Sequence, residues 1–231
     1  MRRILPAFLL LAALVSAQAP DTAEKARRAR DLVVAGKTEE AIALYEELVR
    51  SAPRDAALRM NLSIAQFKAG RYHEAIAHAE EALRLQPALF TANLFLGASY
   101  LELGNPSLAI APLEKFIAAQ PKDRNARLML ARATLALDRY DDAATHYQAA
   151  ADLMPQNPAA WYGLGVAYEA LSARAFSDLE RSAPDSAYFH ALLGDALLAG
   201  RRYGAAAEHY RQALAQQPPL PGVHAGLAAV Y

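Results

Sequence analysis

The sequence predicts an all-α solenoid of stacked helix pairs, and three observations carry this prediction. Alanine supplies 55 of the 231 residues, a composition typical of helices that touch through small side chains. Apolar residues recur at spacings of three and four, which is the period of an amphipathic helix. A fixed longer period, typical of a repeat array, is set by the prolines. The prolines that stand 34 residues apart are Pro53, Pro87, Pro121 and Pro155, and then Pro184 and Pro218.

The first 17 residues have the pattern of a secretory signal peptide. Arg2 and Arg3 precede an apolar run, and small residues follow it. The run is shorter than the roughly 20 residues that cross a bilayer as a helix. Cleavage after Ala17 is favoured over cleavage after Ala19, which would leave a proline directly after the cut. We therefore predict an exported protein, periplasmic or secreted, with no stable membrane anchor after cleavage. An uncleaved anchor is the alternative.

Residues 22–157 contain four copies of one helix–turn–helix unit. Gly36, Gly70, Gly104 and, in a later unit, Gly200 stand where the first helix must stop and turn. The closing proline stops the second helix, because proline lacks an N–H and clashes with the preceding turn. In the first helices a leucine recurs with a small residue after it. These pairs are Leu62-Ser63, Leu96-Gly97, Leu130-Ala131, Leu164-Gly165, Leu193-Gly194 and Leu227-Ala228.

The unit at residues 158–184 lacks the turn between its two helices. It is five residues shorter than the other units, and the gap falls between Tyr168 and Ser172. No glycine or proline interrupts the C-terminal half of this stretch, and its apolar spacing stays helical. The pattern predicts one continuous helix near residues 159–182, about 36 Å long at 1.5 Å per residue. A tight kinked turn near Ser172 is the alternative.

Residues 187–231 hold one further unit and the first half of another, which begins near Pro221. A terminal helix of a repeat array normally carries a polar outer face. Here that face offers only the imidazole of His224. This favours a chain that is cut short relative to a longer product, and a short, poorly solvated cap is the alternative.

The motif Trp161-x-x-Leu164-Gly165-x-x-Tyr168 resembles the tetratricopeptide repeat, and the stretch that begins at Asn93 is similar to it. The resemblance extends over the whole chain after the signal peptide. It implies a right-handed superhelix whose inner surface is lined mainly by the first helix of each pair. As a guide to function it implies a binding role, since the family hosts many of them.

Charge and cysteine content exclude several functions. The chain has 24 basic and 24 acidic residues, so no bulk charge attracts nucleic acid or an anionic membrane. It has no cysteine, which excludes disulfides, thiolate metal sites, a cysteine nucleophile and a cysteine-linked lipid anchor. We interpret the basic cluster of Lys25, Arg27, Arg28 and Arg30 as a solubilising helix face. An acidic partner or lipid head groups are the alternative.

The sequence contains no recognisable catalytic, cofactor-binding or metal-binding set. His73 and His78 resemble a zinc-protease pair, but residues five apart on a helix diverge by about 140°. Gly163-x-Gly165 lacks the third glycine and the preceding strand of a dinucleotide loop. Neither a phosphate-binding loop nor a nucleophile elbow occurs. We therefore predict a non-enzymatic protein without a cofactor.

The predicted inner face is the best candidate for a binding surface. Its lining is mixed and moderately apolar, which suits an extended or helical peptide. Some family members clamp a terminal carboxylate, but of those positions only Asn61 matches, so no clamp is predicted. The candidates from the repeat register are Arg30, Asn61, Ile64, Phe67, Leu94, Ala98, Asn125, Leu128, Arg132, Tyr162 and Tyr188.

We therefore predict an exported tetratricopeptide scaffold that binds protein or peptide partners through its concave groove, in cell-envelope assembly. The alternative is the N-terminal recruitment module of a larger enzyme, or of a polysaccharide-export or cytochrome-maturation machine. Tyr162, Tyr188 and Trp161 are aromatic residues that could stack on sugar rings. Trp161, however, stands at a packing position of the repeat. The sequence predicts neither the partner nor the oligomeric state.

Overall fold

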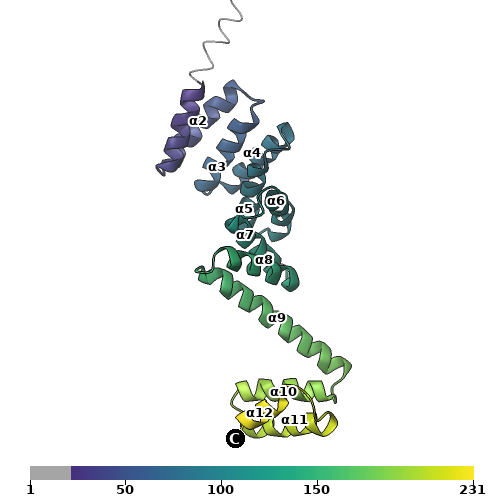
Figure 1. The fold of residues 1–231 in the computed structure, drawn as a ribbon. Coiled ribbons are helices and arrows are strands. Elements are labelled where there is room, and N and C mark those ends of the chain that lie inside the picture. Colours follow the sequence, from purple (N-terminus) through teal and green to yellow (C-terminus); the bar gives the residue numbers. More distant parts are fainter. Residues whose placement is uncertain (1–21) are drawn as a thin grey trace, which may run out of the picture. The chain divides into compact units, whose positions relative to one another are not determined.

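A computed structural model describes residues 22–231, and every regular element in this range is an α-helix (Figure 1). The predicted signal peptide, residues 1–17, lies outside the described residues. The first described helix covers residues 22–34. The later helices are α2 (Thr38–Ser51), α3 (Ala56–Lys68), α4 (Tyr72–Leu85), α5 (Phe90–Glu102), α6 (Pro106–Ala119), α7 (Arg124–Leu135), α8 (Tyr140–Leu153), α9 (Pro158–Ser182), α10 (Ala187–Ala199), α11 (Tyr203–Gln216) and α12 (Val223–Ala229). Among these helices none is both long and apolar enough to cross a membrane.

The helices belong to two compact units, of which the first ends at Leu164 and the second comprises Gly165–Tyr231. In the first unit α3 packs against α4, α5 against α6, and α7 against α8. In the second unit α10 packs against α11, and α12 contacts both of them. The prediction of an all-α array of helix pairs is confirmed.

Each turn inside a helix pair contains one residue in the left-handed region, always at the same place in the repeat. Gly36, Gly70 and Gly104 occupy this place in the first three pairs, with φ angles of 77°, 77° and 72°. Glycine adopts this conformation without a steric penalty because it has no Cβ. The prediction that these glycines end the first helices is therefore confirmed.

Two later pairs make the same turn without a glycine. Asp138 between α7 and α8, and Arg201 between α10 and α11, both have a φ of 57°. Gly200 instead closes α10, with its N–H donating to the carbonyl oxygens of Ala196 and Leu198. The left-handed residue of this turn thus comes one residue after the glycine that the sequence pattern singled out.

Helix α9 is continuous over Pro158–Ser182, 25 residues, as the shortened repeat predicted. No helix break occurs near Ser172, so the alternative of a kinked turn is wrong. The five missing residues are those that hold the left-handed turn residue in every other pair. Without them the chain cannot reverse direction, and the second half of the repeat continues along the axis of the first half.

The two helices of a pair approach each other where a first helix presents a small residue. A Cβ on Gly97 of α5 would lie 2.6 Å from Cγ of Leu113 and 3.2 Å from the carbonyl oxygen of Ala109, both on α6. A Cβ on Gly194 of α10 would lie 2.7 Å from the ring of Tyr210 on α11. The glycines in this place therefore allow the close packing of the two helices.

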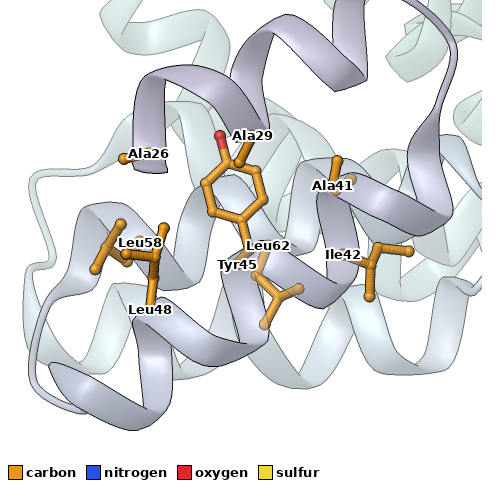
Figure 2. Packing of buried hydrophobic residues seen from close by; sticks show 9 residues of the cluster. Ala26, Ala29, Ala41, Ile42, Tyr45, Leu48, Leu58 and Leu62 are labelled. Carbon is orange, nitrogen blue, oxygen red and sulfur yellow. The ribbon is translucent and has the colours of Figure 1, made fainter. Parts of the chain in front are cut away.

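The core of the first helix pair shows the same arrangement (Figure 2). Tyr45 projects from α2 towards the first described helix, next to Ala29, and only 1% of it is exposed. Leu58 and Leu62 of α3 join the same cluster, so the second repeat covers the apolar face that the first pair leaves open. Each pair depends on the next for burial, as expected of a solenoid.

The imidazole of His146 on α8 is half-buried, and its Nδ1 has no hydrogen-bond partner among residues 22–231. Burial lowers its pKa below the ordinary 6.5, and Arg127 and Arg139 act in the same direction. Asp142 and Glu114 oppose the shift. The folded state therefore binds a proton at His146 less readily than the unfolded chain does.

This imbalance makes the stability depend on pH. As the pH falls through about 6.5, the unfolded chain takes up the proton first, so stability is lost towards acid pH. Replacing His146 with leucine removes this contribution. We expect His146→Leu to lose less in melting temperature between pH 7.5 and pH 5 than the unsubstituted chain, as followed by circular dichroism. Equal losses for the two proteins would contradict the assignment.

The close approach at Gly97 predicts a large effect of one methyl group. Gly97→Ala places its Cβ against Leu113 and the α6 backbone, so we expect a destabilisation of about 1–3 kcal/mol in urea unfolding. Gly204 on α11 is the matched control, because nothing lies within 4 Å of a Cβ there. Gly204→Ala is expected to be neutral or to stabilise by up to about 1 kcal/mol through helix propensity. Equal effects at the two sites would refute the packing.

Candidate partner-binding surface

In the first unit the first helices of the repeats form the inner side of the stack. Helix α3 packs against α5, and α5 packs against α7. The described second helices α2, α4, α6 and α8 do not pack against one another in this way, although Arg71, the N-cap residue of α4, pairs with Glu39 of α2. A stack in which one row of helices is close and the other is splayed curves towards the close row. The groove predicted from the repeat register therefore belongs on α3, α5 and α7.

The candidate residues of this face differ in how much of each is accessible. Arg30, Asn125 and Arg132 are exposed, whereas Asn61, Ile64 and Leu128 are half-buried. Ala98 is 3% exposed, so it packs between helices and offers little to a partner. The accessible part of the surface is thus formed by polar and cationic side chains over a partly apolar floor.

Phe67 and Leu94 serve packing as well as lining the face. The ring of Phe67 lies 5.5 Å from that of Phe95 on α5 in an edge-on arrangement, and 5.6 Å from that of Tyr72 on α4. Leu94 packs against the buried cluster that contains Leu113. Both side chains remain half-buried, so each presents one edge to the groove.

A pocket of about 500 Å³ lies beside the α5–α6 turn, between residues of α5, α7 and α8. Its floor is apolar, with Leu101 from α5 and Leu135 from α7, and Arg132 is the cationic residue in its lining. The guanidinium of Arg132 forms no ion pair or hydrogen bond within residues 22–231. The full lining is Leu101, Gly104, Pro106, Arg132, Leu135, Ala136 and Tyr147.

The phenol of Tyr147, which also lines this pocket, is held neutral. Burial raises its pKa above 10, and the nearby charge of Arg132 only partly opposes the rise. At neutral pH the pocket therefore carries one positive charge and no negative one. Chemically it can accept an apolar side chain and pair its guanidinium with an anionic group beside it.

The candidates from the sequence include Arg132 but not Leu101 and Leu135, which line the same pocket. Both stand at the place in their repeats that Phe67 holds in the second repeat. The signal was therefore present, since one candidate had already been taken from that register position. Which of the equivalent residues line a hollow depends on the distance between neighbouring helices, and the register alone does not give it.

The aromatic candidates at the end of the array lie on different units. Tyr162 belongs to the first unit and is 76% exposed, whereas Tyr188 belongs to the second and is 57% exposed. Trp161 is half-exposed, and its indole Nε1 donates to the carbonyl oxygen of Pro155 at 2.9 Å. Arg59 and Arg127 make the same bond to the closing proline of the repeat before them. Trp161 is thus a link between repeats.

The basic side chains at the start of the described chain lie among acidic ones. Lys25 pairs with Glu47 at 2.8 Å, and Arg27 and Arg28 lie beside Glu24 on a surface of mixed charge. No three His, Asp or Glu side chains in residues 22–231 are gathered so that they could hold a metal ion.

Comparison with known proteins places the chain among repeat proteins. The family profile described as tetratricopeptide repeat matches residues 26–90, 64–124, 94–158, 128–173 and 170–221. No curated protein is similar enough to be matched to the chain.

Solved structures resemble the fold at low sequence identity. YrrB, described as a TPR protein with an unusual peptide-binding site, is 20% identical, with a TM-score of 0.60 over 93% of this chain and 96% of that one. MamA from Desulfovibrio magneticus RS-1 is 23% identical, with a TM-score of 0.54 over 87% and 98%. A tetratricopeptide repeat protein from Parabacteroides merdae ATCC 43184 is 20% identical, with a TM-score of 0.54 over 90% and 84%. Together with the family match, this fold assigns the chain to the tetratricopeptide repeat family.

Proposed function

We propose that this chain is an exported, non-enzymatic scaffold that binds peptide segments of protein partners on the inner face of α3, α5 and α7. The observation that carries the proposal is the pocket at Arg132, which combines an apolar floor with a cation that no described residue neutralises. Peptide binding by a structural relative, YrrB, agrees with this use of the fold.

The chemistry of the pocket defines the segment that it would take. Leu101 and Leu135 favour an aliphatic or aromatic side chain, and Arg132 favours a carboxylate next to it. Asn61 and Asn125 lie farther along the same face and can hydrogen-bond to a peptide backbone. The proposed ligand is therefore an extended or helical segment in which an apolar anchor adjoins an acidic residue.

The place of action in this proposal is the cell envelope, in the assembly of its protein complexes. It rests on the first 17 residues, whose basic start, apolar run and small residues suit export. The absence of cysteine suits an oxidising compartment, because no thiol is present to form unwanted disulfides.

The ligand can be tested by selecting displayed peptides on the purified chain. We expect the selected sequences to share an acidic residue beside an apolar one, and Arg132→Glu to weaken their binding at least about tenfold by reversing the charge of the pocket. Arg50→Glu is the matched control, since Arg50 is exposed at the end of α2, in the outer row of helices. Selected peptides that bind Arg132→Glu and the unsubstituted chain equally would rule out the pocket.

Export can be tested independently by fractionating cells and sequencing the N-terminus of the product. We expect the protein outside the cytoplasm, beginning at Gln18, because cleavage after Ala17 leaves small residues at the recognised positions. A product that retains Met1 and stays in the cytoplasm would contradict export while leaving the peptide-binding proposal in place.

A further inference from the structure

The first half of α9 has no partner at the place where other first helices receive one. Gly165 occupies the same place in its repeat as Gly97 and Gly194. A Cβ on either of those two would meet a side chain of the second helix at 2.6–2.7 Å, but at Gly165 nothing lies within 4 Å. The contact that this glycine allows elsewhere in the array is therefore unmade within the chain.

The next residue on this face is correspondingly exposed. Tyr168 is 53% exposed. Gln66 and Thr134, which hold the same place in the second and fourth repeats, are each 1% exposed. In those repeats the second helix covers the position, and α9 lacks such a helix because its turn is missing. Gly165 and Tyr168 thus occupy packing positions of the repeat but are not covered by a second helix.

The second half of α9 lacks the first helix against which a second helix normally packs. Phe176 stands where Leu113 and Tyr210 project from other second helices. Tyr210 is packed on both sides, by Gly194 of its own pair and by Gly226 of the following helix. Phe176 has a neighbour on the following helix, Phe189 of α10, with ring centroids 5.4 Å apart.

The other side of Phe176 faces open space. A groove of about 440 Å³ runs between the second half of α9 and α10. Its lining combines small and apolar side chains with one carboxylate from each helix: Glu169, Ser172, Ala173 and Phe176 from α9, and Leu192, Asp195 and Ala196 from α10. By its place in the repeat, this groove is where the first helix of the pair would lie. Helix α9 thus contains both half-repeats end to end, and neither half packs against the other.

We propose that a second copy of this chain completes the repeat, by antiparallel pairing of the two α9 helices. Gly165 of each copy then receives Ser172 and Phe176 of the other, as Gly97 receives Ala109 and Leu113 within the third repeat. The axis that relates the copies passes near Ala170, which is the middle of Pro158–Ser182. The pairing is two-fold symmetric, so both vacancies on both copies close at once.

The chain cannot make this contact with itself while α9 is continuous. Gly165 and Phe176 are 11 residues apart, which separates them by about 16 Å along one helix. A partner of a different sequence would need to reproduce both halves of the repeat in the opposite order. A second, antiparallel copy of α9 presents the two halves in that order, and we therefore propose a second copy of the chain as the binding partner.

The oligomeric state of the purified chain tests the proposal directly. We expect a dimer in sedimentation equilibrium, and we expect Gly165→Leu to raise its dissociation constant at least about tenfold by filling the seam between copies. Because nothing lies within 4 Å of that position inside one chain, helicity and melting of the monomer should be preserved. Gly204→Leu, equally open and also helical, is the matched control and should remain dimeric.

Engineered disulfides test the pairing itself, since the chain has no cysteine of its own. Gly165→Cys and Ser172→Cys chains are purified separately, mixed and oxidised. Each chain then carries one cysteine, so a 165–172 disulfide can form only between two chains, and the proposed pairing brings these two positions within the roughly 7 Å between Cα atoms that a disulfide spans. A mixed 165–172 disulfide between chains is therefore expected, and mixing Gly165→Cys with Gly204→Cys should give none.

A monomer at every concentration, or a dimer that survives Gly165→Leu and forms no mixed disulfide, would overturn the proposal. Either result is independent of peptide binding at Arg132, because that pocket lies wholly within the first unit.

Discussion

The structure depends on one side chain that projects from each second helix into the seam between two first helices. Tyr210 shows what this side chain does, because it fills the space over Gly194 in its own pair and over Gly226 in the next helix. Helix pairs of this size cannot bury their own apolar faces. The projecting side chain contacts the first helix of its own pair and the first helix of the next pair, so it holds each pair together and also stacks the pairs. This stacking aligns α3, α5 and α7 side by side as one surface.

In α8 and α11 a large projecting side chain is matched by a glycine 16 positions later, whereas Tyr45 of α2 is followed at that distance by Asn61. Tyr147 and Tyr210 are followed by Gly163 and Gly226, and a Cβ on either glycine would collide with the tyrosine ring at 2.2 and 2.5 Å. Where the projecting residue is Ala79, the later residue is instead a phenylalanine at 95. Close packing requires such compensation, because interiors tolerate neither a void nor an overlap. Gly163 is therefore explained by Tyr147.

The sequence predicted those parts of the fold that local chemistry controls. The three turn glycines followed from the backbone conformation that a turn requires, and the continuous helix at 158–182 followed from a five-residue deletion. Both signals are visible in the sequence alone. The turns at Asp138 and Arg201 were harder to anticipate, because there the surrounding pair holds a non-glycine residue in the left-handed region. Tertiary packing outweighs the local preference at such positions.

The binding surface could be predicted only in part, for a related reason. Arg132 and Ala98 were taken from the same position of the repeat register, yet Arg132 lines a pocket whereas Ala98 is buried. Helical register tells which side of a helix a residue is on, but adjacent first helices cover part of that side. Whether Leu101 and Leu135 line a hollow depends on how far α5 and α7 diverge, and that separation depends on side chains in the seam behind them.

The deletion in the fifth repeat illustrates how closely folding and association are related in repeat proteins. Removing five residues leaves the packing residues of both half-repeats in place, since Gly165, Phe176 and the register of α10 are preserved. What is lost is only the ability of the two halves to meet within one chain. The two half-repeats have complementary packing surfaces, and this complementarity does not depend on a turn that links them in one chain. A missing turn therefore converts a contact within a chain into one that two chains can satisfy together.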